Sequence, residues 1–345
     1  MVSEEYFALV HQPIPIKKAL QIPEAKAAVD KEWKKLLDKN AFDLKSVREK
    51  QDVADQAKRE GRTVHFGHLM DLCHLKHAEL DPEFQKYKGR VVFRGDAVKD
   101  ESGFYAVFSE QGTSASHLAA AKFLDALARM PGMDGEDSDA VGAYTQVALE
   151  DFQKKTGSPV VETWITLPPH QRPKEWSKYE NPVCKLRLNL YGHPLAGLFW
   201  EIHCQTALYE IGFEKVKGWE CLYMHREKQV LLSVYVDDFK MAGKPENIKK
   251  AWKMLRDPKM GNLKMDEPEK AEKFIGCEHE VKTVTKNGKQ VTQVSYYMKD
   301  FLKACVDRYL ELAKKPRSSL RHAPTPFLPD EDAEIEDADT DGALG

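Results

Sequence analysis

The sequence lacks the features that mark membrane, secreted and disulfide-stabilised proteins. None of its apolar runs approaches the roughly 20 residues that a membrane-spanning helix needs. Residues 1–5 carry no basic segment followed by an apolar one, so no secretory signal is expected. No two cysteines form a Cys-x-x-Cys pair, which indicates reduced thiols and an intracellular protein, cytoplasmic or nuclear. The cysteines are Cys73, Cys184, Cys204, Cys221, Cys277 and Cys305.

The charge of the chain is unevenly distributed. The formal net charge is −3, but eight acidic residues and no basic one lie within residues 330–341. Removing those eight charges leaves +5 on the rest of the chain, which permits contacts with phosphate without requiring them. We expect the acidic segment, residues 326–345, to be disordered.

Hydrophobic spacing predicts helices and strands in no regular alternation. A continuous helical region is expected over residues 24–60, and strands over residues 63–66 and 90–93. Further predicted helices are an alanine-rich one capped within residues 113–116 and ending near 129, one beginning at Pro194, one over residues 245–255 and one over residues 299–314. Further predicted strands are residues 222–225, 230–236 and 274–281, with a hairpin turn at Asn287-Gly288. This order excludes a doubly wound sheet and indicates an α+β protein.

Aspartates lie at the ends of two predicted strands. Asp237 and Asp238 follow the apolar run of residues 231–236, where two adjacent carboxylates repel each other unless a cation or hydrogen bonds offset their charge. An Asx-type turn is the simpler explanation. Asp139 ends another extended stretch, and Gly142 and Ala143 leave space beside it. One aspartate from each of two neighbouring strands is the minimum set for holding two Mg²⁺ ions.

Several segments, in a fixed order, resemble the reverse-transcriptase domain of copia-type long-terminal-repeat retrotransposon polyproteins. The matching segments are residues 27–40, Tyr87-Lys88-Gly89-Arg90-Val91-Val92, residues 139–146, Trp164-Ile165-Thr166-Leu167-Pro168-Pro169, residues 183–200, Tyr235-Val236-Asp237-Asp238, Phe274-Ile275-Gly276 and Ala323-Pro324-Thr325-Pro326. Each match alone is weak, and their common order over residues 25–326 carries the resemblance.

The resemblance implies an RNA-directed DNA polymerase with a right-hand fold. Fingers and palm would span residues 24–282, with an antiparallel palm sheet backed by helices; a partial thumb would span residues 283–325, and residues 1–23 would be an extension. The partners would be an RNA or DNA template with its primer and deoxynucleoside triphosphates, with no membrane, and the cofactor would be two Mg²⁺ ions, with Mn²⁺ as a substitute. The ribonuclease H and integrase domains of such a polyprotein are missing from this sequence.

The resemblance also implies roles for individual residues. Asp139 and Asp237 would hold the catalytic metals, with Asp238 as a weaker ligand. The expected nucleotide-binding residues are Lys88, Arg90, Tyr144 and Gly192, and the expected primer or template contacts are Tyr235, Phe274 and Gly276. Structural alternatives are a packed core for Tyr144 and Tyr235 and strand-edge solvation for Lys88 and Arg90. Lys264 is a further candidate, for protonation of pyrophosphate.

Some residues depart from the family pattern or suggest other functions. Pro194, Leu195 and Leu198 replace polar residues of the family block, so a catalytically inactive remnant that keeps the fold and binds nucleic acid is the alternative hypothesis. A metal-dependent nuclease would use similar carboxylates, but it gives no role to Tyr144 and Gly192. A local cluster suggests zinc, although its spacing matches no zinc family; it consists of His65, His68, Cys73, His74 and His77.

Overall fold

The computed structural model describes residues 11–78, 82–108, 118–157, 159–270, 273–274, 277–297 and 299–321. These residues fall into two compact units, which meet in the sequence between Tyr297 and Lys299. Several expectations lie outside the described residues, namely the helix cap within residues 113–116, the role of Gly276, the segment Ala323-Pro324-Thr325-Pro326 and the acidic segment, residues 326–345.

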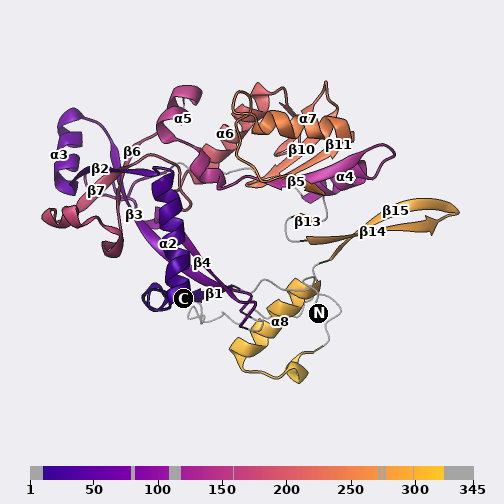
Figure 1. Ribbon diagram of the computed structural model, residues 1–345, viewed down its shortest axis with the longest axis horizontal. Helices are drawn as coiled ribbons and strands as arrows, with labels where there is room; N and C mark the ends of the chain where they lie inside the picture. The colour runs from indigo at the N-terminus through magenta and orange to yellow at the C-terminus, as the bar shows by residue number, and fades with distance from the viewer. Residues whose placement is uncertain are drawn as a thin grey trace, which may run out of the picture. The chain divides into compact units, whose positions relative to one another are not determined.

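Helices and strands are mixed along the described chain, as an α+β protein requires (Figure 1). The α-helices are α1 (Ile16–Ala19), α2 (Pro23–Asp38), α3 (Lys50–Glu60), α4 (Leu118–Ala128), α5 (Leu149–Thr156), α6 (Ala196–Glu210), α7 (Pro245–Arg256) and α8 (Lys299–Ala313). The strands are β1 (His11–Ile14), β2 (Phe42–Glu49), β3 (Val64–Lys76), β4 (Lys86–Phe93), β5 (Asp134–Asp139), β6 (Glu162–Thr166), β7 (Pro182–Leu186), β8 (Glu214–Lys215), β9 (Leu222–His225), β10 (Val230–Tyr235), β11 (Asp238–Gly243), β12 (Glu269–Lys270), β13 (Lys273–Phe274), β14 (Cys277–Lys286) and β15 (Lys289–Tyr297). None of the helices in these residues is both long and apolar enough to cross a membrane.

The first sheet has the order β1-β3-β6-β7-β2, and β4 pairs with β3 beside this path. The long strand β3 uses its first half to pair with β6 in parallel and its second half to pair with β4 and β1. Helix α2 buries Val29, Trp33 and Leu36 and packs against β4. The two elements approach so closely that a Cβ on Gly89 would lie 2.5 Å from the Ala28 carbonyl oxygen, so only glycine fits there.

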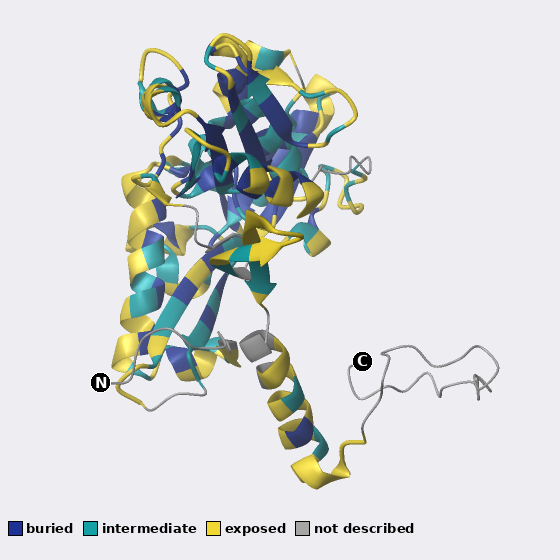
Figure 2. Ribbon diagram, turned by 90° about the vertical axis from the view of Figure 1, so that its right-hand side faces the viewer, coloured by how far each residue is buried: buried dark blue, intermediate teal, exposed yellow. Residues whose placement is uncertain are grey.

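The second sheet has the order β12-β5-β11-β10-β9-β8, and every pairing in it is antiparallel. Helix α4 covers one face, where Leu124 packs with Leu222 and Ala242. Helices α6 and α7 pack with Met241 and Tyr223, whose side chains point to the opposite face because neighbours along a strand alternate. Figure 1 shows α7 and α4 on the two sides of the strands, and Figure 2 shows buried residues concentrated in this layered region.

The predicted continuous helical region over residues 24–60 is wrong, because β2 separates α2 from α3. Helix α2 ends where Asn40 adopts a left-handed backbone with φ +51°. The chain then turns into the core at Ala41 and Phe42, and β2 pairs with β7. Charged residues recur through β2 as they do through α2, so the local pattern did not reveal the strand.

Several other predicted elements lie close to their expected positions. Helices α6, α7 and α8 and strands β9 and β10 occupy the expected segments. The turn between β14 and β15 places Asn287 at φ +53° and Gly288 at φ +74°, the backbone of a type I′ hairpin turn. In the second unit, α8 leaves Leu302, Tyr309 and Leu312 exposed and buries Leu310.

Candidate active site

The predicted catalytic aspartates meet at one end of the second sheet. Strands β5 and β11 pair antiparallel, and their register sets Asp139 directly opposite Asp238. Side chains of directly paired residues point to the same face of a sheet. The two carboxyl groups are hydrogen-bonded to each other, so residues 99 positions apart in the sequence form one acidic pair.

The turn that carries Asp237 is held by two hydrogen bonds. Strands β10 and β11 are joined by Val236 and Asp237, and Val236 adopts a left-handed φ of +56°, which is costly for a β-branched residue. The Trp200 indole Nε1 on α6 donates to the Val236 carbonyl oxygen at 2.6 Å. The Ala140 amide, next to Asp139, donates to the Asp237 carbonyl oxygen at 2.7 Å. Helix α6 and β5 therefore fix the turn from two sides.

The acidic residues of this site raise one another's pKa. Burial, followed by the charges of Asp139 and Asp237, raises the pKa of Asp238 from 3.8 to about 7. Partial burial and the charge of Asp237 also raise the pKa of Asp139. Asp266 and Glu269 add to the negative charge around Asp139. Because the charged forms of these carboxyl groups are disfavoured, a bound cation would stabilise them.

The carboxylates offer the hard oxygen ligands that Mg²⁺ prefers. Asp139 and Asp238 are already paired, and the charge of Asp237 acts on both. Within the described ranges, no three Asp, Glu, His or Cys side chains are arranged to hold a metal ion together. The chemistry of the site therefore fits a divalent cation at the Asp139–Asp238 pair, and Asp237 would have to turn its carboxylate to join it.

A short segment after α7 lines the other edge of β5. The Val141 amide donates to the Lys264 carbonyl oxygen at 2.8 Å, and the Asp266 amide donates to the Asp139 carbonyl oxygen at 2.9 Å. The Gln146 side chain donates to the Lys264 carbonyl and accepts from the Lys264 amide. These bonds hold the Lys264 backbone beside Asp139 and Val141, and the role of Lys264 stays a prediction.

Two tyrosines lie within electrostatic range of Asp237. The rings of Tyr144 and Tyr191 lie 4.4 Å apart between centroids. Partial burial and the charge of Asp237 raise the pKa of Tyr144, and the same causes raise that of Tyr191 to about 12. Tyr144 thus lies in the predicted site, whereas Tyr191 was noted only as part of a family block.

Gly192 lies at a position where only glycine fits. Its φ is +86°, and a Cβ on it would lie 2.1 Å from the Phe93 carbonyl oxygen at the end of β4. The Phe93 amide donates to the Tyr191 carbonyl oxygen at 2.7 Å. The close approach that the glycine permits is therefore to β4, and its contact with a nucleotide stays a prediction.

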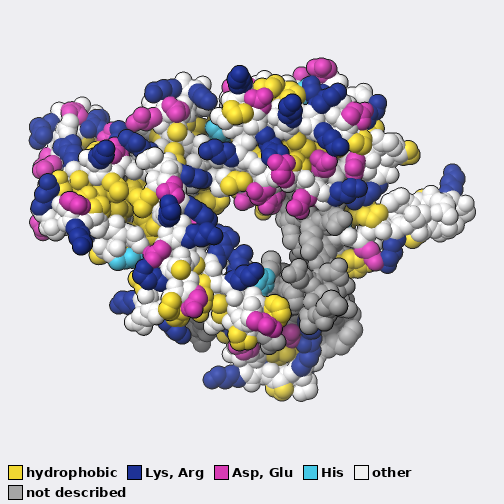
Figure 3. Space-filling view, in the orientation of Figure 1, with side chains coloured by type: hydrophobic (Ala, Val, Ile, Leu, Met, Phe, Trp, Pro, Cys, Tyr) yellow, Lys and Arg dark blue, Asp and Glu magenta, His cyan; other side chains and the backbone are white. Residues whose placement is uncertain are grey.

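Lys88 and Arg90 lie on β4, and Arg90 is exposed. Burial, followed by the charges of Lys76 and Arg90, lowers the pKa of Lys88, so these cations are crowded. Tyr191 is within electrostatic range of both Arg90 and Asp237. Figure 3 shows Lys and Arg side chains gathered over the region of β3 and β4, and acidic side chains along the lower edge of the second sheet. A basic surface therefore faces the acidic site.

A comparison with protein-family models matches residues 74–308 to the reverse transcriptase (RNA-dependent DNA polymerase) family. The chain belongs to this family. The match covers Asp139, Asp237, Asp238 and most of the described residues, and members of the family are nucleotidyltransferases that bind a template, a primer and deoxynucleotides. Reverse transcriptases generally use divalent metal ions. A search of curated proteins finds no match.

The remaining predicted contacts of this reverse transcriptase are only partly described. Tyr235 ends β10, pairs with Asp238 and is half-buried. Phe274 ends β13, but its side chain lies outside the described residues, as does all of Gly276. The predicted primer contact at this segment stays a prediction.

The departures from the family block differ in burial: Pro194 is exposed, whereas Leu195 and Leu198 are half-buried. His193 is buried, and burial lowers its pKa to about 4, so its ring is neutral. That ring packs against Phe93, Phe108 and Phe199. His193 therefore packs in the core of the reverse transcriptase, and Leu195 packs against the same core.

The His/Cys cluster of the reverse transcriptase does not assemble in the part of the chain that the structure describes. His65 and Cys73 lie on one face of β3, and His68 and His74 lie on the other, because side chains alternate along a strand. His65 packs instead against the ring of Phe108 at 5.1 Å. The zinc hypothesis therefore finds no support among these residues.

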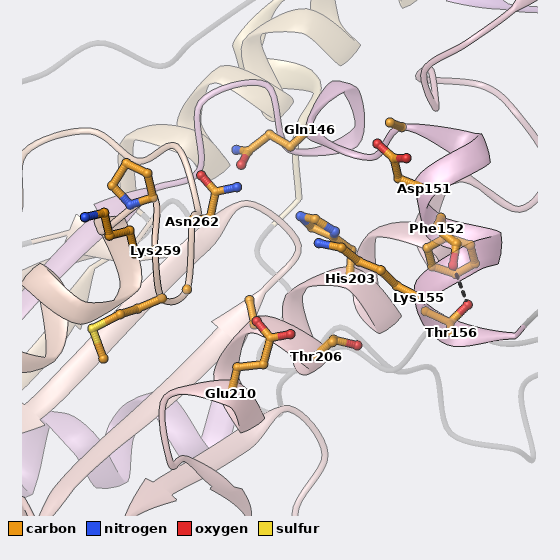
Figure 4. A pocket seen from close by; sticks show the side chains of 15 residues that line it. Gln146, Asp151, Phe152, Lys155, Thr156, His203, Thr206, Glu210, Lys259 and Asn262 are labelled. Carbon is orange, nitrogen blue, oxygen red and sulfur yellow. Dashed lines mark hydrogen bonds between the residues drawn. The ribbon is translucent and has the colours of Figure 1, made fainter.

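A polar pocket of about 240 Å³ lies between α5, α6 and the loop after α7 (Figure 4). Asp151, Lys155, His203 and Glu210 line it with both signs of charge. The His203 ring lies 5.9 Å from the ring of Trp200, whose indole donates to the Val236 carbonyl oxygen.

Proposed function

We propose that the chain is the polymerase core of a copia-type retrotransposon and copies RNA into DNA by two-metal nucleotidyl transfer. The pairing of Asp139 with Asp238 across β5 and β11, with Asp237 in the adjoining turn, is the observation that carries the proposal. The copia-type assignment is supported by the order of the matching segments over residues 25–326.

The same proposal assigns the sheets to the parts of a right-hand polymerase. The first sheet, with α2 and α3, would form the fingers, and the second sheet, backed by α6 and α7, would form the palm. Fingers and palm would span residues 24–282, and a partial thumb would span residues 283–325. The basic side chains on β4 face the acidic site across Tyr144 and Tyr191, as a triphosphate-binding wall would.

Each residue of the site would have a separate role in the reaction. Bound divalent ions would lower the pKa of the primer 3′-hydroxyl and stabilise the charge on the departing phosphate. Asp139 and Asp237 would hold these ions, with Asp238 assisting. Lys88 and Arg90 would bind the triphosphate by charge, and Arg90 can form paired hydrogen bonds with it. Tyr144 would lie against the sugar and exclude a 2′-hydroxyl.

Primer extension on an RNA template tests the proposal. We expect Asp237→Asn to lower the extension rate ~10³-fold or more, because the variant loses a metal ligand while keeping the shape of the side chain. Asp151→Asn serves as a matched control, since Asp151 is a well-exposed carboxylate on α5. Equal extension by wild type and Asp237→Asn would refute the assignment of Asp237. Extension by neither protein would refute the polymerase function.

A further inference from the structure

A buried ion pair lies beside the proposed catalytic carboxylates, two residues along the same strands. Lys240 follows Asp238 by two residues on β11 and pairs with Asp137 on β5, so all three side chains and Asp139 share one face of the sheet. The Lys240 ammonium lies 2.9 Å from Asp125 Oδ1 on α4 and 3.5 Å from Asp137 Oδ1. The side chains of Lys240 and Asp125 are each 1% exposed. Charges buried this deeply require one another.

The second oxygen of Asp125 reaches a different part of the molecule. The Tyr296 hydroxyl on β15 donates to Asp125 Oδ2 at 2.8 Å, and His279 Nδ1 on β14 lies 3.8 Å from the same oxygen. His279 and Tyr296 are cross-strand partners with rings 4.7 Å apart. The Lys122 ammonium lies 5.3 Å from the centre of the Tyr296 ring. Asp125 therefore joins the catalytic sheet to the β14–β15 hairpin.

The opposite face of this hairpin is exposed and carries three lysines, of which Lys282 is paired with Glu280 on the same face. Lys282, Lys286 and Lys289 alternate with the residues that face Asp125, so they point away from it. All three are exposed. Exposed lysines along a strand suit the phosphate backbone of a nucleic acid, which they contact without reading its sequence.

We propose that Asp125 and Lys240 are positioning residues that fasten the β14–β15 hairpin to the catalytic sheet, so that its lysines hold the backbone of the primer–template. Lys240 neutralises Asp125 from the strand that carries Asp238, and Asp125 binds the hairpin through Tyr296. The proposal rests on the proposed polymerase function for the identity of the nucleic acid. The contacts that fasten the hairpin do not depend on catalysis.

Tyr296→Phe tests the proposal, because it removes one hydroxyl and keeps the ring between His279 and Lys122. Loss of a hydrogen bond to a buried carboxylate is expected to speed hydrogen exchange of the β14–β15 amides about tenfold. Tyr297→Phe is the matched control, since the neighbouring Tyr297 hydroxyl donates only to Glu280 within the hairpin itself. That control should leave the exchange of the hairpin within about twofold of wild type.

Measurements of primer–template affinity and of extension kinetics distinguish a lost positioning contact from a general loss of structure. With a fluorescein-labelled DNA primer on an RNA template, Tyr296→Phe should raise the dissociation constant about tenfold, measured without nucleotide. The kcat at saturating primer–template and the KM for deoxynucleotides should stay within about twofold of wild type. A structural defect alone would lower kcat through a smaller folded fraction and leave the affinity of the remaining protein unchanged.

A double variant provides a second test. Asp125→Leu with Lys240→Met removes both charges together, so neither remains buried alone. It should loosen the hairpin as Tyr296→Phe does, and Lys240→Arg should retain the wild-type exchange. Unchanged hairpin exchange in Tyr296→Phe would refute the fastening, and a looser hairpin with unchanged primer–template affinity would refute its role in binding. If wild type binds primer–template but extends nothing, the polymerase function fails while both measurements still decide this proposal.

Discussion

Replacing Asp238 by asparagine should make the metal-free protein more stable at alkaline pH. In the unfolded chain this carboxyl group loses its proton near its ordinary pKa of 3.8, whereas in the folded chain it keeps the proton to about pH 7. Between these pH values folding takes up a proton, so the free energy of unfolding falls as pH rises. The loss of stability is complete above about pH 7, the pKa of Asp238 in the folded chain. It is absent below pH 3.8, the ordinary pKa of the group in the unfolded chain. Asparagine cannot ionise, so the variant does not lose this stability as pH rises.

The size of the effect follows from the pKa difference and the exposure of the side chain. A rise from 3.8 to about 7 corresponds to ~4 kcal/mol between the charged and neutral forms. Because Asp238 is only half-buried, solvent screening reduces this to ~1–2 kcal/mol. For a chain of this size that is ~1.5–3 °C in the midpoint of thermal unfolding.

Thermal unfolding in excess chelator measures the effect. Asp238→Asn should unfold at a higher temperature than wild type at about pH 8, and the difference should vanish near pH 4. Excess Mg²⁺ should raise the midpoint of wild type more than that of the variant, because a ligand stabilises the state that binds it. Asp151→Asn controls for the loss of a surface carboxylate. An Asp238→Asn protein no more stable than wild type at alkaline pH would refute the account of the acidic pair.

Two further substitutions test how the site is built. Gly192→Ala should lower the free energy of unfolding by ~2 kcal/mol or more, because a Cβ at φ +86° would lie 2.1 Å from the Phe93 carbonyl oxygen. Urea unfolding measures this loss of stability, and an unchanged midpoint would contradict the close packing of Gly192 on Phe93. Trp200→Phe should lower the primer-extension rate ~10-fold while costing ~1 kcal/mol of stability, because it removes the 2.6 Å hydrogen bond to the Val236 carbonyl that holds the catalytic turn. If Trp200→Phe extended primers at the wild-type rate, the turn between β10 and β11 would not depend on this hydrogen bond.

The sequence predicted the parts of the fold whose signals are local. The Asn287-Gly288 turn, the apolar stripe of α6 and the apolar strand β10 each carry their pattern within a few residues, and the structure has them in place. Asp237 and Asp238 were also found this way, since charged residues at the end of the apolar strand β10 stand out. Their pairing with Asp139 across β5 and β11 was inferred from the resemblance alone.

The sequence could not predict features that depend on contacts between distant segments. Strand β5 reads Asp-Gly-Glu-Asp-Ser-Asp, which has no strand pattern, and it is a strand because β11 and β12 supply partners on both edges. Lys240 reads as an ordinary charged residue, yet it is 1% exposed because Asp125, 115 residues away, neutralises it. Neither burial nor pairing of this kind leaves a periodic signal.

The strand order of the second sheet has a consequence for folding during synthesis. Its acidic strand β5 is made about 100 residues before β11 and still earlier than β12, its two partners. Until the ribosome has passed residue 270, at least one edge of β5 has no partner to pair with. Unpaired edges invite aggregation, and contacts this distant in sequence form slowly. The four acidic residues of β5 repel other chains during this interval, so the same charges that make the strand hard to recognise protect it until the sheet closes.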